Sequence, residues 1–180
     1  MGKAIVLYTP DEHDAVFEEA DSSRPLSGAP LPSIVAAENK LFLAYYTKLW
    51  LPEGRPNSPV LVSGSSLGTI SLTEFECPIA FFSVPVSNET FDAHPLAFRG
   101  LSGYGVFRVE NSSWIRRLTA VQYYHSKPYP GAFSDKKHFI FVFHDSIVEV
   151  AADDLRERSF DGSMIDAQGE MLQLMRDPSS

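Results

Sequence analysis

The sequence has only one cysteine and no long apolar run. Cys77 therefore cannot form an internal disulfide, and no stretch approaches the roughly 18 apolar residues of a membrane-spanning helix. The N-terminus also lacks the charged, then apolar, then small-residue pattern of a secretory signal. These features exclude a small disulfide-stabilised scaffold, and they predict a cytoplasmic protein without a membrane partner.

Positive charge is scarce as well. There are 15 Lys and Arg residues against 23 Asp and Glu, and the formal net charge is -8. Because nucleic-acid binding is driven by Lys and Arg that neutralise phosphates, nucleic acid is not an expected partner. The charge is also uneven: residues 11–21 contain six acids and no Lys or Arg, whereas residues 116–137 contain five basic residues and the single acid Asp135. Such an asymmetry is usually that of two ordinary solvated faces, and a basic and an acidic partner site are the alternative. Together with the lack of a nucleophile, metal or phosphate motif, it favours a binding or interaction module.

Cofactor and metal motifs are missing. The apolar segment 4–8 is not followed by a glycine-rich phosphate-binding pattern. Ser66 stands between Gly64 and Gly68 as in a hydrolase nucleophile elbow, but that elbow needs a following helix and the residues after Gly68 predict a strand. His138 and His144 would be roughly 20 Å apart on an extended strand, too far to share one metal ion. We therefore expect no cofactor and no metal.

The clearest pattern is a β-hairpin over residues 137–152. Two runs of aromatic and β-branched residues meet at His144-Asp145-Ser146, where the Asp and Ser side chains favour a turn. With a loop of two or four residues, one face is wholly apolar and must be buried; it comprises Phe139, Phe141, Phe143, Val148, Val150 and Ala152. The other face mixes ionisable and apolar side chains, namely His138, Ile140, Val142, His144, Ile147, Glu149 and Ala151. Any chemistry of the hairpin is expected on this second face.

The other patterns predict an α+β protein with a single domain over residues 1–180. Capping residues and apolar spacing predict helices near residues 10–20, 112–125 and 163–176. Segment 153–162 is predicted to be turn-like, and 177–180 to be a disordered tail. Further strands are expected at 4–8, 33–37, 41–47, 60–62, 69–73, 79–86 and 104–110. Segment 41–49 also has helical spacing, which leaves a helix open there. Because the turns are closely spaced, we expect one largely antiparallel, twisted sheet of about seven or eight strands with two or three packed helices.

The candidate catalytic residues are His144, Glu149 and Asp145. If Asp145 and Ser146 form a two-residue loop, His144 and Glu149 are diagonal neighbours about 7–8 Å apart at the backbone. An imidazole and a carboxylate at this separation can act as an acid and base pair, with Asp145 as support. The alternative is structural: Asp145 makes only a turn bond, and His144 lies on the surface. A second set of rings is predicted to line a ligand site or a partner surface, with ordinary packing at the boundary of the core as the alternative: His138, His125, Tyr124 and Trp114.

Three segments carry a resemblance to known proteins. His94-Pro95-Leu96, Asn111-Ser112-Ser113-Trp114-Ile115 and His138-Phe139-Ile140-Phe141-Val142-Phe143-His144-Asp145-Ser146 resemble a small family of uncharacterised bacterial proteins. The resemblance covers roughly the second half of the chain and implies a cytoplasmic protein of bacterial type. It implies no activity and no catalytic role.

Two classes of function remain after these exclusions. The first is a binding or interaction module that recognises a protein partner or a small molecule. The alternative is a small enzyme or small-molecule-binding protein with its site on the face of the hairpin that carries His144 and Glu149. An enclosed cavity at His144 would favour the alternative, and a flat surface there would favour the interaction module.

Overall fold

The computed structural model describes residues 8–28, 31–50, 62–85, 91–122, 131 and 133–176. These residues form nine strands and two α-helices, and the strands belong to two antiparallel sheets. The first sheet has the order β1 (Ala15–Glu18), β6 (Gly105–Glu110), β7 (Lys137–Val142), β8 (Ile147–Ala152) and β5 (Ala80–Val84). The second has the order β2 (Ser33–Ala36), β3 (Leu41–Leu49), β4 (Leu67–Glu76) and β9 (Asp154–Ser163). The predicted α+β class is confirmed, but two sheets replace the expected single sheet.

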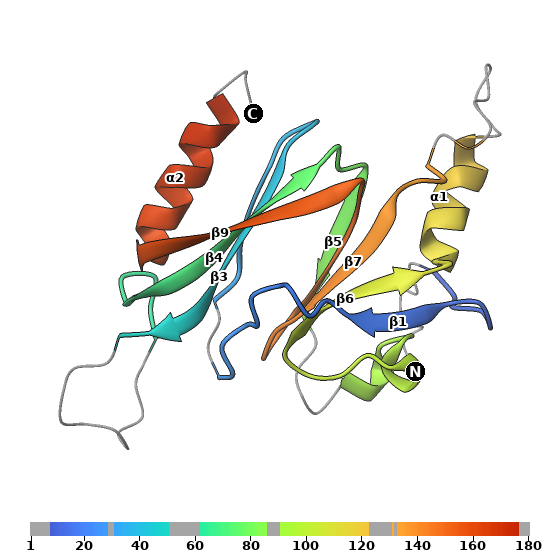
Figure 1. The fold of residues 1–180 in the computed structure, drawn as a ribbon, viewed down its shortest axis with the longest axis horizontal. Helices are drawn as coiled ribbons and strands as arrows, with labels where there is room; N and C mark the ends of the chain where they lie inside the picture. Colours follow the sequence, from blue (N-terminus) through green and yellow to red (C-terminus); the bar gives the residue numbers. More distant parts are fainter. Residues whose placement is uncertain are drawn as a thin grey trace.

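The two sheets and the two helices form four layers. Helix α1 (Ser113–Gln122) lies outside the first sheet, and α2 (Met164–Arg176) lies outside the second (Figure 1). Two short 3-10 helices, η1 (Phe91–Ala93) and η2 (Ala97–Arg99), lie between β5 and β6 in the chain. Each sheet is therefore covered on one face by the other sheet and on the opposite face by helical segments.

The apolar face of the β7–β8 hairpin is the core between the sheets, as predicted. Phe139, Phe141 and Phe143 are each at most 2 % exposed and pack against side chains of the second sheet. Tyr45 and Phe75 from that sheet contact the Phe141 ring, with centroid distances of 6.0 Å and 5.7 Å. Aromatic contacts of this kind stabilise the fold by more than the burial of their apolar area alone.

The opposite face of the hairpin is also buried, which the sequence does not predict. It packs under α1 and the segment around Leu96, in a cluster that includes Trp114, Ile140, Val142 and Ile147. Since both faces of the first sheet are covered, His138 and Glu149 on this face lie inside the molecule rather than on its surface.

Several predicted elements are confirmed. The two helices predicted for the second half of the chain are present, and residues 33–49 form the preferred hairpin rather than a helix. Strands are also present where they were predicted at 79–86 and 104–110.

The predicted helix over residues 10–20 is wrong. Residues 15–18 form β1, which pairs with β6 through contacts such as Val16 with Val109. The polar residues that resembled a helix start form a turn instead, in which the Asp14 carboxylate accepts a hydrogen bond from the Asp11 backbone nitrogen. The same carboxylate accepts one from the Ser113 nitrogen at 2.8 Å, so Asp14 caps α1 rather than a helix of its own.

The turn-like segment predicted at 153–162 is also wrong, because β9 runs through it and pairs with β4 along its whole length. Leu155 and Phe160 are the partly buried apolar residues of this charged strand. Strand β9 is an edge strand of the second sheet, and charged side chains are a common protection of such edges. The expected hairpin between 60–62 and 69–73 is not formed as predicted: β4 pairs with β3 and β9 on its two sides.

The predictions for residues 4–7, 60, 61 and 177–180 lie outside the described residues. Within the part of the chain that the structure describes, no helix combines the length and apolar character needed to cross a membrane.

Candidate functional site

The register of the β7–β8 hairpin decides which side chains meet. Val142 pairs with Ile147 and Ile140 pairs with Glu149, so residues 143–146 form the loop. The loop is closed by a hydrogen bond from the Phe143 nitrogen to the Ser146 carbonyl at 2.9 Å. This register puts His138 diagonally opposite Glu149 on the same face.

Glu149 is the centre of a buried hydrogen-bond network. Its carboxylate accepts three hydrogen bonds, from Tyr8 Oη at 2.7 Å, His94 Nε2 at 2.8 Å and His138 Nε2 at 2.6 Å. These donors come from three separate parts of the chain, and Glu149, His138 and His94 are all at most 5 % exposed. A buried carboxylate without donors would cost several kcal/mol, so the donors allow Glu149 to occupy the core.

The network also sets the charge of Glu149. Burial by itself would raise the pKa of this carboxyl, but the hydrogen bonds that His138 and His94 donate outweigh burial and lower the pKa to about 2. The pKa of the Tyr8 hydroxyl changes in the opposite direction: burial raises this pKa, and the neighbouring Glu149 raises it further. Glu149 is thus an anion and Tyr8 a neutral donor at neutral pH.

The second ring nitrogen of His138 contacts Ser112. Ser112 Oγ lies 2.8 Å from His138 Nδ1, and the backbone nitrogen of Ile115 donates a hydrogen bond to the same oxygen at 3.3 Å. Because an ionised carboxylate can only accept, His138 Nε2 carries a proton toward Glu149, and the neutral ring then presents Nδ1 as an acceptor. The Ser112 hydroxyl donates to it, which completes a chain of contacts from Ser112 through His138 to Glu149.

Ser112 occupies a sharp turn from a strand into a helix. Strand β6 ends at Glu110, Asn111 has a φ of 52°, and α1 begins at Ser113. Asn enters this left-handed region more readily than most residues because its short side chain can hydrogen-bond locally. As the capping residue, Ser112 has its hydroxyl at the positive end of the α1 dipole.

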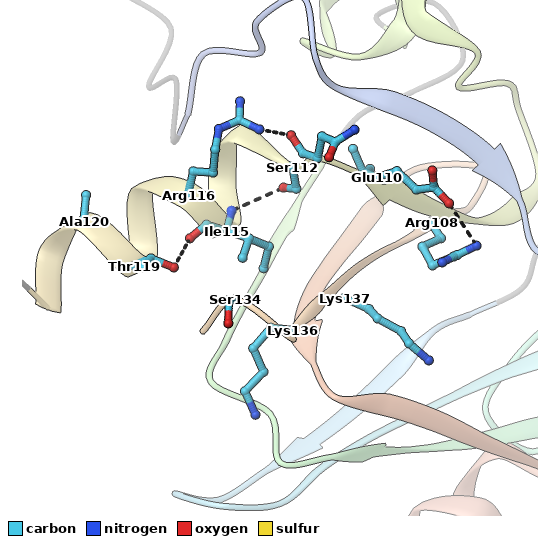
Figure 2. Close-up of a pocket in the computed structure, with 12 residues that line it drawn as sticks. Arg108, Glu110, Ser112, Ile115, Arg116, Thr119, Ala120, Ser134, Lys136 and Lys137 are labelled. Carbon is cyan, nitrogen blue, oxygen red and sulfur yellow. Dashed lines mark hydrogen bonds and ion pairs between the residues drawn. The ribbon is translucent and has the colours of Figure 1, made fainter. Parts of the chain in front are cut away.

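Beside this turn is a cleft of about 660 Å³ between α1, the end of β6, the start of β7, and the residues Ser134 and Lys136 that precede β7. Ser112, Ile115 and Thr119 lie along its α1 side, and Lys136 and Lys137 lie opposite them (Figure 2). A volume of this size is within the range of small-molecule sites, about 300–1,000 Å³. The complete lining is Arg108, Val109, Glu110, Asn111, Ser112, Ile115, Arg116, Thr119, Ala120, Ser134, Lys136 and Lys137.

The basic side chains of the cleft are paired with acids. Arg108 pairs with Glu19 at 2.7 Å, and Arg116 pairs with Asp11. Lys136 and Lys137 pair with Asp153 and Asp154, each at 2.7 Å. The Arg116–Asp11 pair joins the basic segment 116–137 to the acidic segment 11–21, and Lys136 and Lys137 pair with acids outside that segment. These pairs weaken the argument for a charged partner surface. Such exposed pairs contribute little stability and can exchange with a ligand.

The structure does not bring the predicted catalytic residues together. His144 Nδ1 lies 2.7 Å from Asp145 Oδ1 on the exposed loop, whereas Glu149 is buried with His138, His94 and Tyr8. The expected pair of His144 and Glu149 is wrong because the hairpin register differs by two residues from the assumed one. Asp145 supports His144 only.

The predicted ligand or partner surface is also different. Trp114 and His138 are buried and contact each other with a centroid distance of 4.8 Å, so neither belongs to a surface. Tyr124 and His125 lie outside the described residues.

The functional residues that the sequence reasoning missed are Ser112, His94 and Tyr8. Ser112 was interpreted only as a helix cap, and His94 had no interpretable pattern around it. The structure joins His94, Ser112 and His138 in one network: His94 and His138 hydrogen-bond Glu149, and Ser112 hydrogen-bonds His138. Among the described residues, no group of three or more His, Cys, Asp or Glu side chains is arranged to hold a metal ion.

Comparisons of the chain with models of protein families, with curated proteins and with solved structures found no match.

Proposed function

We propose that this protein binds a small molecule in the cleft beside α1, and that Ser112 is the residue through which the ligand meets the buried network. One observation carries the proposal: Ser112 lines the cleft and at the same time hydrogen-bonds His138, which is itself hydrogen-bonded to Glu149. A network that served the core alone would not need to end at a cavity wall.

The chemistry of the lining indicates the class of ligand. Arg108, Arg116, Lys136 and Lys137 supply cationic groups, and Ser112, Thr119 and Ser134 supply hydroxyls. Val109, Ile115 and Ala120 add an apolar wall. This combination suits a small polar molecule with an anionic group and an apolar part, and the anionic group would replace one of the exposed carboxylates that now pair with the basic side chains.

The interaction module expected from the charge asymmetry has less support than this small-molecule site. Asp11 of the acidic segment already pairs with Arg116 of the basic segment, and Glu19 pairs with Arg108. A protein partner would have to compete with these pairs over a large surface, whereas a small anion needs to displace only one.

The test is native mass spectrometry of the protein isolated gently from its own cells, in the parent and in two variants of α1. Ala120→Trp fills the cleft, because Ala120 is part of its lining. Val121→Trp is the matched control, since Val121 is 60 % exposed and is not part of the lining. We expect a retained small molecule in the parent and in Val121→Trp, and none in Ala120→Trp. Equal retention in both variants, or none in the parent, would contradict the proposal.

A further inference from the structure

We propose that Ser112 is a nucleophile for acyl transfer from a carboxylic ester, with His138 as its general base and Glu149 as the group that orients His138. This inference rests on the ligand cleft proposed above, because the ester would have to reach Ser112 through it.

The three side chains have the contacts that this chemistry requires. A nucleophilic serine needs a base within about 2.6–3.2 Å, and the base needs a third group that fixes its tautomer. Ser112 Oγ is 2.8 Å from His138 Nδ1, and His138 Nε2 is 2.6 Å from Glu149 Oε2. Such a triad is recognised by geometry and roles rather than by order in the chain.

The backbone around Ser112 supports the same role. A nucleophile elbow holds its serine on a sharp turn between a strand and a helix, the context that Ser66 lacks. Ser112 has β6 before it, α1 after it, and the positive φ of Asn111 between them. The positive end of the α1 dipole and the Ile115 N–H both favour negative charge on Ser112 Oγ.

The remaining residues of the network keep His138 in its working state. Tyr8 and His94 each donate to Glu149, so the carboxylate stays ionised and fixed while it accepts from His138. The His94 ring is itself held by a hydrogen bond from the Leu96 nitrogen to Nδ1 at 3.2 Å. Tyr8 and His94 are positioning residues, since they act through Glu149.

The reaction balances with water as the co-reactant. Ser112 Oγ attacks the ester carbonyl carbon while its proton moves to His138 Nδ1, and the alcohol leaves with that proton as the C–O bond breaks. Water then attacks the acyl-serine and gives a proton to His138, which returns it to Ser112 Oγ as the carboxylic acid is released. No oxidation or reduction occurs, and Glu149 remains an anion throughout.

The first experiment is labelling of the parent with a fluorophosphonate probe, followed by peptide mapping, which needs no variant to fold. We expect one adduct, on Ser112. Ser112→Ala should lose the adduct, and Ser113→Ala should keep it. Ser113 is a matched control because it is the next residue and its hydroxyl has no hydrogen-bond partner among the described residues.

The second experiment is hydrolysis of p-nitrophenyl acetate. Ser112→Ala should abolish the rate above background, and His138→Gln should lower kcat by about 10²–10⁴-fold, the usual contribution of a general base. Glu149→Gln should lower kcat and change its pH profile, which a merely structural loss would not do. Circular dichroism of each variant identifies loss of folding.

The two proposals fail separately. If the probe labels another serine or none while the small molecule is still retained in an Ala120-dependent way, the nucleophile is overturned and the ligand cleft stands. If Ser112 is labelled but nothing is retained, the ligand proposal fails as stated and the reactivity of Ser112 stands.

Discussion

Glu149 and His138 are diagonal neighbours across the β7–β8 hairpin, and their 2.6 Å contact is sealed from solvent. Contacts of this kind are costly to break, since removing one partner leaves the other unpaired in apolar surroundings. His144 offers the opposite case on the same hairpin, because it contacts Asp145 on the exposed loop.

The two histidines should therefore differ sharply in their effect on stability. We expect His138→Ala to lower the free energy of unfolding by about 3–5 kcal/mol, the range for leaving a buried charge, here that of Glu149, without its partner. His144→Ala should change it by less than about 1 kcal/mol, as for an exposed pair. Urea unfolding at neutral pH measures both. Equal effects of the two substitutions would show that the hairpin register is wrong.

The low pKa of Glu149 predicts how stability changes in acid. Its pKa is lowered from 4.5 to about 2 on folding, so its contribution is complete above the unfolded value and is lost as pH falls toward the folded value. At about 1.4 kcal/mol for each tenfold change, this lowering of the pKa corresponds to roughly 3.5 kcal/mol in full, of which about 3 kcal/mol is lost once the pH has fallen to the folded value.

Glu149→Gln should remove this part of the acid sensitivity. Unfolding free energies measured in urea from about pH 5 to about pH 2 should fall by about 3 kcal/mol more in the parent than in the variant. Other carboxyls with lowered pKa values, such as Asp11 and Asp154, are present in both proteins and cancel in the difference. Parallel curves would mean that Glu149 is protonated in the folded protein at neutral pH or is not buried.

Tyr8 should contribute to stability through its hydroxyl. Tyr8→Phe keeps the ring, which stacks on Trp114 at a centroid distance of 6.1 Å, and removes one of the three donors to Glu149. We expect a loss of about 1–3 kcal/mol in the free energy of unfolding, typical of a buried hydrogen bond to a charged group. An unchanged stability would mean that His94 and His138 alone satisfy the carboxylate.

The features of the fold that could be predicted from the sequence are those that depend on residues close together in the chain. The alternating Phe139, Phe141 and Phe143 determine a buried face by local geometry, and α1 follows from its capping residues and apolar spacing. Thr9 and Glu12 form a helix-capping pattern, which wrongly predicts a helix over segment 15–18. The strand that forms there is stabilised by its pairing with β6, a contact distant in the sequence. The charged strand β9 likewise depends on its pairing with β4.

The sequence predicts the wrong neighbours for Glu149 for a similar reason. Glu149 lies on the mixed face of the hairpin, but a shift of two residues in register exchanges His144 for His138 as its neighbour. The turn residues Asp145 and Ser146 suit either register. Tyr8, His94 and Ser112 reach Glu149 and His138 only through tertiary contacts, so no spacing in the sequence connects them.

The apolar face of the hairpin should be essential for stability and irrelevant to chemistry. Phe141 is fully buried between the sheets, and Phe141→Ala should cost about 3–5 kcal/mol as a large-to-small core substitution. Phe98→Ala is the control, because Phe98 is 83 % exposed and its removal should change stability by less than about 0.5 kcal/mol. Thermal melting and urea unfolding measure both changes.

At a temperature where both variants are folded, Phe141→Ala should keep the fluorophosphonate reactivity of Ser112, since the ring faces the second sheet and not the network. If Phe141→Ala melts within about one or two degrees of the parent, the ring does not fill the space between the sheets and the layered packing is wrong.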